Sequence, residues 1–319
     1  MNERPTDPLI SIALCTYNGA QYLREQLDSL LAQTHSNIEI VAVDDCSTDA
    51  TFEILMEYHA RDARVRVIAN EANLGFRKNF ARAASLCVGD FIAPCDQDDV
   101  WLPEKLTTLL RAIGEHPLAY CDSELIDEQG ASLDVAMSDI FAMVSTDDPA
   151  VFAAGNCVSG HALLCRRELV ERAFPAPTCF FHDWWLAAVA ASAGGIVYCE
   201  RKLVRYRYHG TNVTDILGER TIRRHRGYRW KQLREFRERL EHLARLPGGS
   251  RAFIERLRDL WIAREEQWFS LTLACFIFRH GSRLFALRKS GRHPVRYVLR
   301  YAPGLRLKRI ANPFGYAQV

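Results

Sequence analysis

Three carboxylates lie within four residues in the segment Asp96-Gln97-Asp98-Asp99, which directly follows the apolar run Phe91–Cys95. Carboxylates this close repel one another unless a cation lies among them. Mg²⁺ and Mn²⁺ prefer oxygen ligands and are often shared between protein carboxylates and substrate phosphates, where they stabilise a departing diphosphate. The segment therefore predicts a divalent metal site. The alternative is that the acids stabilise the N-terminus of a helix that begins near Pro103.

A second pair of acids, Asp44 and Asp45, ends another apolar run, Ile38–Val43. Carboxylates at such a position accept hydrogen bonds from a nucleobase or from ribose hydroxyls in nucleotide-binding sheets. Capping of the following helix is the alternative. We expect the two residues to divide these tasks.

The segment 70–79 opens a helix with Gly75 and the cations Arg77 and Lys78. Glycine and free backbone N–H groups at a helix N-terminus suit contact with phosphate or ribose. The spacing is not that of a P-loop. The segment alone therefore predicts only a contact with the phosphate or ribose of a ligand.

Two downstream segments add a possible base and a possible metal ligand. His182-Asp183-Trp184-Trp185 places a carboxylate beside two indoles. Sugars stack on aromatic rings, and the carboxylate is a suitable general base for an acceptor hydroxyl. An amphipathic helix with a capping acid and core tryptophans explains the same residues. His209 is a suitable metal ligand as a neutral imidazole, or it is structural.

Alternating strands and helices would bring these residues together. The periodicity predicts helices over 20–33, from 47–49 through Tyr58 and over 76–86. The predicted strands are Ile10–Cys15, Ile38–Val43, Val65–Ala69, Phe91–Cys95, Leu118–Cys121, Ile196–Cys199 and Leu203–Tyr206. This order is typical of an α/β fold with parallel strands, whose ligands bind beyond the carboxyl ends. Residues 126–150 are predicted as loop, and residues beyond about 218 as helices interrupted at 247–249.

The motifs in this order resemble those of the family 2 glycosyltransferases of the GT-A (Rossmann-like) fold. They are Ser11–Asn18 (SIALCTYN), Val43–Asp49 (VDDCSTD), Asn73–Gly75 and Asp96–Asp99 with Trp101. The downstream His182–Trp185 and His209–Asn212 resemble a bacterial subgroup that includes rhamnosyltransferases of cell-surface polysaccharide and lipopolysaccharide synthesis. The resemblance reaches about residue 214.

The resemblance implies a role for each matched position. It implies Asp183 as the catalytic base of an inverting transfer and Asp98, Asp96 and His209 as ligands of Mn²⁺ or Mg²⁺. The implied acceptor-binding residues are Gly160, His182, Trp184 and Trp185. The implied donor-binding residues are Thr16, Tyr17, Asn18, Asp44, Asp45, Asn73, Gly75, Arg77, Asn79, Asp96 and Gln97. Asp99 is left without an assigned role.

Charge divides the 319 residues into two parts. Residues 1–200 carry 13 Lys+Arg and 30 Asp+Glu, whereas residues 201–319 carry 28 Lys+Arg and 9 Asp+Glu. We therefore predict a transferase domain over 1–215 and a helical, basic region over 216–319. A basic surface attracts anionic lipid or nucleic acid, or it is a solvated helix face. The segment 223–231 interleaves arginines with Tyr228 and Trp230, which favours a membrane surface over nucleic acid.

The location and the activity follow as expectations. The polar N-terminus lacks a signal peptide, the longest apolar run (268–278) is too short to span a bilayer, and the ten cysteines form no CxxC pair. We expect a cytoplasmic protein, free or bound to the inner face of the membrane. We expect transfer from a nucleoside-diphosphate sugar, with dTDP-rhamnose or a UDP-sugar favoured, to a glycan or lipid-linked acceptor. A nucleotidyltransferase and a non-catalytic nucleotide-sugar-binding module are the alternatives.

Overall fold

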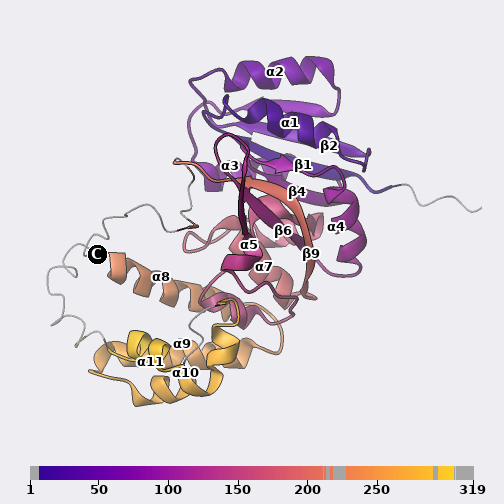
Figure 1. The fold of residues 1–319 in the computed structure, drawn as a ribbon. Coiled ribbons are helices and arrows are strands. Elements are labelled where there is room, and N and C mark those ends of the chain that lie inside the picture. The colour runs from indigo at the N-terminus through magenta and orange to yellow at the C-terminus, as the bar shows by residue number, and fades with distance from the viewer. Residues whose placement is uncertain are drawn as a thin grey trace, which may run out of the picture.

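One mixed sheet with helices on both sides forms most of the molecule (Figure 1). The computed structural model describes residues 7–210, 212, 216–217, 228–289, 294–304 and 306. The strand order is β3-β2-β1-β4-β8-β6-β9-β5, with β7 paired to β6. The strands are β1 (Ile10–Thr16), β2 (Ile38–Asp44), β3 (Val65–Ala69), β4 (Phe91–Cys95), β5 (Val100–Trp101), β6 (Leu118–Ile126), β7 (Ser132–Ala136), β8 (Leu163–Arg166) and β9 (Ile196–Arg207).

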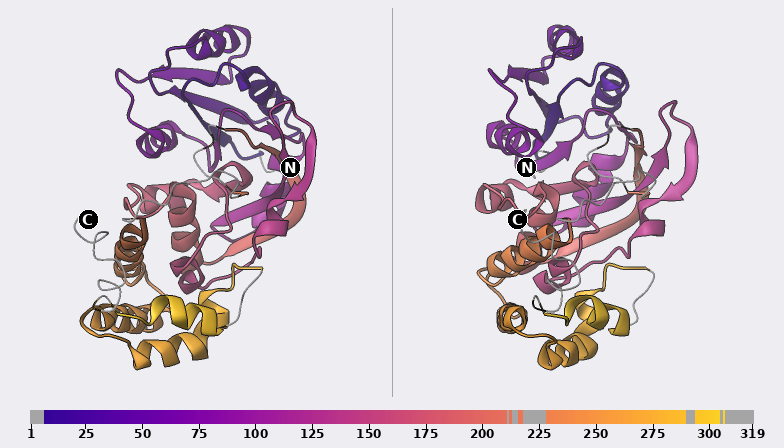
Figure 2. Two further views of the ribbon diagram at one scale, coloured as in Figure 1. Left: turned by 60° about the vertical axis from the view of Figure 1, so that its left-hand side comes forward. Right: turned by 90° about the vertical axis from the view of Figure 1, so that its left-hand side faces the viewer.

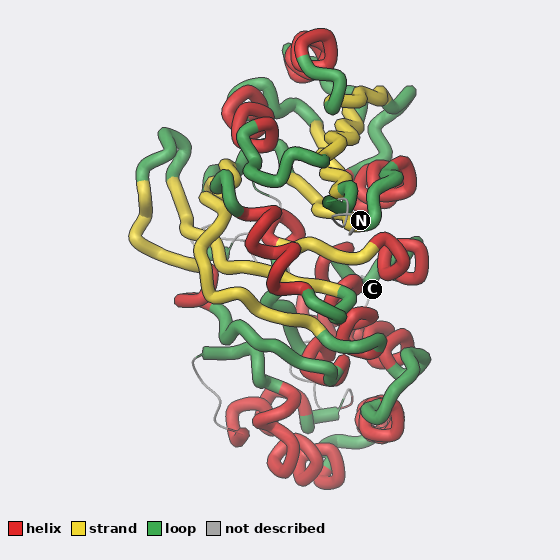
Figure 3. Tube along the Cα trace, turned by 90° about the vertical axis from the view of Figure 1, so that its right-hand side faces the viewer, coloured by secondary structure: helices red, strands yellow, loops and turns green. Residues whose placement is uncertain are grey.

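Helices of the first two hundred residues cover both faces of this sheet (Figure 3). They are α1 (Leu23–Leu31), α2 (Thr51–Arg61), α3 (Phe76–Leu86), α4 (Lys105–Ile113), α5 (Met137–Ile140), α6 (Arg167–Ala173) and α7 (His182–Ser192), with the 3₁₀ helices η1 (Pro149–Ala153) and η2 (Gly160–Ala162). Side chains alternate between the faces along a strand. Ile12 and Leu14 of β1 accordingly pack with α1, α2 and α4, while Ala13 and Cys15 pack with α3 and α7.

The predicted mostly parallel α/β sheet is confirmed in its N-terminal part. Strands β3, β2, β1 and β4 run parallel, and β6 pairs with β9 in parallel. Strand β8 lies antiparallel between β4 and β6, and β5 is antiparallel to β9. The carboxyl ends of β1, β2 and β4 therefore meet at one edge.

The prediction for residues 126–208 was wrong in two places. The segment 126–150 is not loop throughout, because β7 folds back on β6 and is followed by α5. The two strands predicted around 196–206 are one strand, β9. Its register against β6 shifts where Cys121 pairs with Cys199 and Asp122 with Lys202. The exposed charges of Glu200 and Arg201 in this irregularity interrupted the apolar pattern that a sequence reading uses.

The C-terminal part is helical, as predicted, and packs on the sheet domain at the end remote from α1 and α2 (Figure 2). Its helices are α8 (Tyr228–Leu243), α9 (Arg251–Ala263), α10 (Leu271–Leu284) and α11 (Pro294–Tyr301), with η3 (Arg264–Glu266) between α9 and α10. Phe236, Leu240 and Trp261 share one apolar core with residues of α7 and η1. Among the described helices, none combines the length and apolar character needed to span a bilayer. The boundary at 215/216 stays a prediction.

The basic and aromatic segment predicted over 223–231 lies mostly outside the described residues. Arg223, Arg224 and Arg226 are among the residues that the structure does not describe. Tyr228, Arg229 and Trp230 are described only as the first turn of α8. Lys231 is exposed and pairs with Glu235 on the same helix.

Candidate active site

The candidate site begins with the register of three parallel strands. Thr16 at the end of β1 pairs with Asp44 at the end of β2, and Leu14 pairs with Cys95 at the end of β4. The polar residues after these strands therefore meet at one edge of the sheet. Asn18 (φ 49°) and Cys46 (φ 64°) adopt left-handed backbone conformations just beyond β1 and β2. Such conformations are costly for residues other than glycine and are typical of functional loops.

Asp44 is tied to its own loop. One carboxylate oxygen accepts hydrogen bonds from the Thr16 hydroxyl (2.9 Å) and the Ser47 hydroxyl (2.6 Å). The other accepts from the Ser47 N–H (2.9 Å). Asp44 is 2% exposed, so these bonds replace water. Its predicted contact with the donor stays a prediction.

Asp45 organises the loop before α3. Its carboxylate accepts from the Asn70 amide (2.6 Å) and from the Gly75 N–H (2.8 Å), and the Asn73 side chain also accepts from that N–H (3.0 Å). The Asn70 amide also donates to the Asn79 side chain (2.9 Å). Gly75 has φ 80°, a conformation that glycine adopts at little cost. Asp45 and Asn79 are buried and have protein partners, which favours a positioning role for both.

Gln97 joins the loop after β4 to the loop after β1. Its side-chain oxygen accepts from the Tyr17 N–H (2.8 Å), and its amide donates to the Tyr17 carbonyl (3.1 Å). A β-carbon at Gly19 would lie 2.2 Å from the end of the Gln97 side chain, so a larger residue there would displace Gln97 from this position. Asn18 accepts from the Thr48 N–H (2.8 Å) and so links this loop to the one after β2. The Tyr17 side chain is exposed beside these contacts.

The remaining acids include carboxylates that lie close enough to interact with one another. Burial, together with the Asp98 and Asp183 carboxylates, raises the pKa of Asp96 to about 7. The Asp98 carboxylate lies 2.9 Å from the Nε2 atom of His209. Asp96 and Asp183, which are 87 positions apart, are therefore electrostatic neighbours, and Asp98 interacts with both Asp96 and His209.

Arg207, for which the sequence reading gave no role, fixes this group from behind. Its Nε donates to the Asp98 carbonyl (2.9 Å), and its backbone N–H donates to the Asp99 carboxylate (3.1 Å). Its guanidinium pairs with Glu25 (2.5 Å) and lies 4.6 Å from the centre of the Tyr22 ring. The side chain is 2% exposed. Arg207 thus joins the acidic loop to α1, two residues before His209.

A second group of possible metal ligands lies deeper. The side chains of Asp96, Asp99 and His161 bring one ligand atom each to within 4.8 Å of one another. Asp99 is fully buried, and one of its oxygens has no hydrogen-bond partner. The ammonium of Lys105, also fully buried, donates to the His161 carbonyl (2.6 Å). Lys105 also lowers the pKa of Asp96 and Asp99, so part of their negative charge is compensated within the protein. The deeper group and the Asp98–His209 pair are both candidate metal ligands.

Asp183 begins α7 next to the η2 loop. Its carboxylate accepts from the Trp184 N–H (2.6 Å), and burial raises its pKa to about 6 although backbone N–H groups of Trp184 and Gly160 lower it. A β-carbon at Gly160 would lie 2.7 Å from the His182 ring, so glycine permits this close approach. His182 stacks on Phe80 (4.2 Å between centres), and burial lowers its pKa to about 4. Its ring is therefore neutral and packed behind Asp183.

The two tryptophans are held by main-chain carbonyls. Trp184 donates to the Phe152 carbonyl (2.7 Å) and Trp185 to the Ala173 carbonyl (2.8 Å). Trp185 is 9% exposed and belongs to the apolar core. Trp185 therefore contributes to the core, and its predicted acceptor contact stays a prediction. Trp184 is half-buried, and its acceptor role stays a prediction.

Exposed aromatic rings near Asp183 come from residues that the sequence reading did not select. Phe76 at the start of α3 and Phe181 just before α7 stack with 5.7 Å between ring centres. Both are more than a third exposed. The Arg77 guanidinium lies over the Phe181 ring (5.0 Å) and donates to the Thr178 carbonyl. Arg77 thus joins α3 to the loop before α7, and its predicted donor contact stays untested.

Two cavities in the described structure lie away from the candidate active site. One of about 470 Å³ is between α9 and α10, and one of about 260 Å³ is beneath α3 and α6. Neither is lined by Asp96, Asp98 or Asp183.

Comparison with known proteins links these residues to a family. The profile described as "Glycosyl transferase family 2" matches residues 11–174, just over half of the chain. An uncharacterized glycosyltransferase of Haemophilus influenzae is 26% identical over 223 residues, which are 66% of this chain and 68% of that protein. TuaG of Bacillus subtilis, a glycosyltransferase provisionally named for teichuronic acid biosynthesis, is 34% identical over 129 residues, 40% of this chain and 51% of TuaG.

Solved structures share the fold at low sequence identity. S. aureus TarS 1–349 in complex with UDP-GlcNAc superposes with a TM-score of 0.55 at 18% identity, covering 86% of this chain and 81% of TarS 1–349. The mannosyltransferase PcManGT from Pyrobaculum calidifontis, in complex with GDP-Man and Mn²⁺, gives 0.53 at 16% identity, covering 92% of this chain and 79% of PcManGT. These likenesses establish the GT-A fold.

Proposed function

Because the chain belongs to glycosyl transferase family 2, we propose that it is a metal-dependent, inverting enzyme that uses a nucleoside-diphosphate sugar. The acceptor is a hydroxyl of a glycan or lipid-linked glycan of cell-surface polysaccharide synthesis. One observation carries the proposal: Asp96 is the electrostatic neighbour of both Asp98 and Asp183, and the Asp98 carboxylate lies 2.9 Å from His209.

The metal proposal rests on the donor set. Asp98 and His209 offer an oxygen and a nitrogen 2.9 Å apart, and Asp96 adds a second carboxylate in the same group. Carboxylate oxygens suit both Mn²⁺ and Mg²⁺, whereas an imidazole ligand is better suited to the transition metal Mn²⁺ than to Mg²⁺. A divalent cation held there supplies positive charge to the departing diphosphate. Arg207 holds the Asp98 carbonyl and so keeps this loop in place.

Asp183 is the proposed base. Its pKa of about 6 leaves the carboxylate ionised at pH 7, yet more basic than an exposed aspartate. As the acceptor oxygen bonds to the anomeric carbon, the bond from that carbon to the diphosphate oxygen breaks, and the hydroxyl proton passes to Asp183. A single displacement on the face opposite the leaving group inverts the configuration.

The nucleoside is proposed to contact Thr16, Tyr17, Asn18 and the loop that Asp44 holds. Tyr17 is the exposed aromatic ring among them. TarS binds UDP-GlcNAc and PcManGT binds GDP-Man, so proteins of this fold accept different bases. We favour dTDP-rhamnose or a UDP-sugar as the donor, in line with the sequence resemblance.

The proposal also includes the predicted division into domains and the predicted location in the cell. Residues 1–215 form the proposed transferase domain, and residues 216–319 hold the enzyme near its acceptor or at the inner face of the cytoplasmic membrane. The net charges of the two parts, negative and positive, support this division.

A panel of nucleotide sugars tests the proposal. Thermal unfolding is measured with dTDP-rhamnose, UDP-sugars and GDP-sugars, each with Mn²⁺, with Mg²⁺ and with EDTA. A donor present at about 100 times its Kd adds about 2.7 kcal/mol of stability, so the matching donor raises Tm by several degrees. The expected result is an increase for one base class, abolished by EDTA. Equal stabilisation with EDTA would refute the metal, and no stabilisation by any donor would refute the proposal.

A further inference from the structure

The outer side of α10 exposes large apolar side chains. Leu271 is 72% exposed, Phe278 is 62% exposed, and Trp268 in the preceding turn is 53% exposed. Leu271 and Phe278 are seven residues apart on the helix and therefore lie on one face, while Leu273 and Ile277 point into the core. Single exposed leucines are common, but an apolar face on an outer helix indicates an interaction surface.

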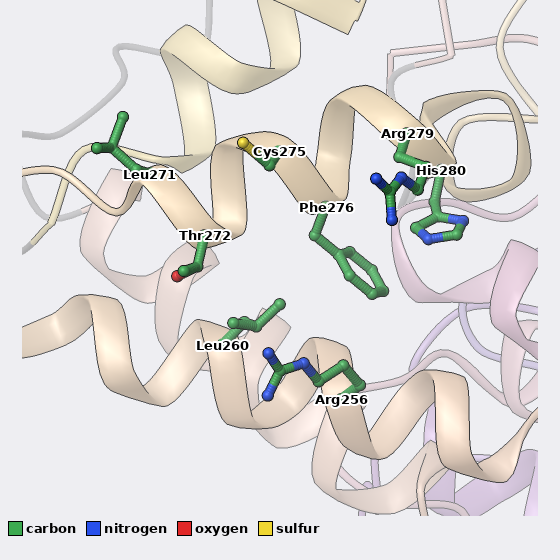
Figure 4. A pocket seen from close by; sticks show the side chains of 8 residues that line it. All are labelled: Arg256, Leu260, Leu271, Thr272, Cys275, Phe276, Arg279 and His280. Carbon is green, nitrogen blue, oxygen red and sulfur yellow. The ribbon is translucent and has the colours of Figure 1, made fainter.

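Cations border this apolar face. A cavity of about 470 Å³ lies between α9 and α10 and is lined by Arg256, Arg279 and His280 as well as by Leu271. Figure 4 shows Arg256 on α9 and Arg279 on α10 to either side of the Phe276 ring. Arginine beside exposed apolar side chains is typical of surfaces that meet both acyl chains and phosphates.

These two arginines differ from those around them. Arg237 pairs with Glu241 and Arg251 with Glu255 on their own helices. Arg256 and Arg279, in contrast, form no ion pair with any residue of the described part of the chain. The sequence beyond Glu266 contains 10 Lys+Arg and no Asp or Glu. Arg283 and Lys289 pair with Asp148 and Asp139, whereas the charges of Arg256 and Arg279 are left for a partner outside the described part of the chain.

We propose that this α10 surface, defined by Trp268, Leu271, Phe278, Arg256 and Arg279, docks on a lipid bilayer that contains anionic phospholipids. The apolar side chains enter the acyl boundary, and the two guanidinium groups bind headgroup phosphates. Charge complementarity selects an anionic bilayer, and the exposed apolar face disfavours nucleic acid. The 14-residue helix lies in the plane of the interface, because it is too short to cross. This inference rests on the membrane location included in the proposed function, but the surface lies outside the donor site, so donor binding and transfer are tested separately.

Vesicle sedimentation tests the proposal. The full chain is mixed with vesicles of phosphatidylcholine alone or with about 30% phosphatidylglycerol, at low and at high salt. We expect binding only to the vesicles with phosphatidylglycerol, weakened by salt because the headgroup attraction is screened. No binding to these vesicles, or equal binding to phosphatidylcholine alone, would overturn the proposal.

Two variants locate the contact. Replacing both arginines (Arg256→Gln with Arg279→Gln) is expected to weaken vesicle binding by about 25-fold, since each cation near such a surface contributes roughly fivefold. Phe278→Glu removes an apolar contact and adds a negative charge, and is expected to abolish binding. Leu271→Gln, at a more exposed position, replaces it if Phe278→Glu lowers the melting temperature.

Matched controls lie on other elements. Val88→Glu alters an apolar residue that is 58% exposed before β4, and Arg111→Gln alters an exposed arginine of α4. Both controls should bind vesicles as the unaltered chain does. Binding that is equally impaired in the controls, or unimpaired in the α10 variants, would show that this surface is not the contact. Donor-induced thermal stabilisation is measured in parallel and should be the same in every variant.

Discussion

Two groups of acids lie at the same edge of the sheet but in opposite electrostatic situations. Asp44 and Asp45 are buried, and their oxygens accept hydrogen bonds from hydroxyl, amide and backbone N–H groups. Asp96 is close to Asp98 and to Asp183, and burial raises the pKa of Asp96 to about 7 and that of Asp183 to about 6. In the first group hydrogen bonds fix the carboxylates in their loops, whereas in the second group burial disfavours the charged form and, at Asp96, the neighbouring carboxylates do so as well.

This difference supports the proposed division between acids that position loops and acids that take part in the reaction. A carboxylate with all its bonds made inside the protein fixes a loop, and Asp45 does so for the turn that opens α3. Carboxylates that repel one another lower the stability of the free protein and are relieved by a bound cation or proton. Active sites commonly accept such a cost, because preorganised charge acts on the reacting groups.

The largest expected effect comes from removing the proposed base. Asp183→Asn keeps the shape of the side chain but cannot accept the proton, so we expect turnover to fall about a thousandfold. Donor-induced thermal stabilisation should persist. Transfer to acceptor is measured beside Glu171→Gln, a control at an exposed acid of α6. An Asp183→Asn enzyme with unaltered turnover would exclude Asp183 as the base.

The metal group is tested next. Asp98→Ala and His209→Ala each remove one proposed ligand, and each should raise the Mn²⁺ concentration for half-maximal donor stabilisation by at least about tenfold. His116→Ala alters an exposed histidine bound to the Gly194 carbonyl and serves as the control. If both site variants titrate like the control, the metal is held elsewhere, and the deeper group with His161 becomes the next candidate.

The contrast between the two groups of acids predicts that two similar substitutions change the free energy of unfolding in opposite directions. Asp45→Ala leaves the Leu74 N–H without its acceptor and removes one of two acceptors from the Gly75 N–H and the Asn70 amide, so the free energy of unfolding should fall by about 1–3 kcal/mol. Asp96→Asn removes a repelling charge and should raise it by about 1–2 kcal/mol in metal-free protein. Urea unfolding at pH 8 with EDTA measures both. A loss of stability in both variants would contradict the distinction drawn here.

The pH dependence of transfer follows from the raised pKa of Asp183. The base form of the carboxylate is present above a pH of about 6 and is lost as the pH falls through that value. We therefore expect kcat/KM to fall about tenfold per pH unit below 6. Rates are measured between about pH 4.5 and about pH 8, in steps of roughly half a pH unit, at saturating Mn²⁺. A flat profile down to pH 5 would show that proton transfer to Asp183 does not limit the reaction.

The sequence predicted the N-terminal strands and the residues at their ends because both follow from local patterns. Continuous apolar runs mark buried parallel strands, and the acids come directly after them. Its errors have a common physical cause, namely dependence on tertiary contacts. Trp184 and Trp185 are the same residue type in the sequence, yet Trp185 faces the core. The exposed pair of Phe76 and Phe181 forms only because α3 packs near the loop before α7.

The same reason explains the residues that sequence reading missed. Arg207 lies two residues before the recognised segment His209–Asn212, but its contacts to the Asp98 carbonyl and to Glu25 join residues more than a hundred positions away. Lys105 had no signal, because a buried lysine is rare and its place beside His161 depends on the fold. Predicting the roles of such residues requires the tertiary packing of the chain, because the sequence pattern does not contain these contacts.

The smallest expected effect concerns the aromatic pair beside the proposed base. Phe181 is exposed two residues before Asp183, and Phe76 and Arg77 hold its ring in place. A sugar that stacks on this ring gains about 1 kcal/mol, so Phe181→Ala should raise the acceptor KM roughly fivefold and leave donor binding unchanged. Phe52→Ala, an exposed ring on α2, is the control. Because the substitution leaves Asp183 and its neighbours in place, a fall in kcat at an unchanged KM would mean that Phe181 positions α7 and does not contact the acceptor.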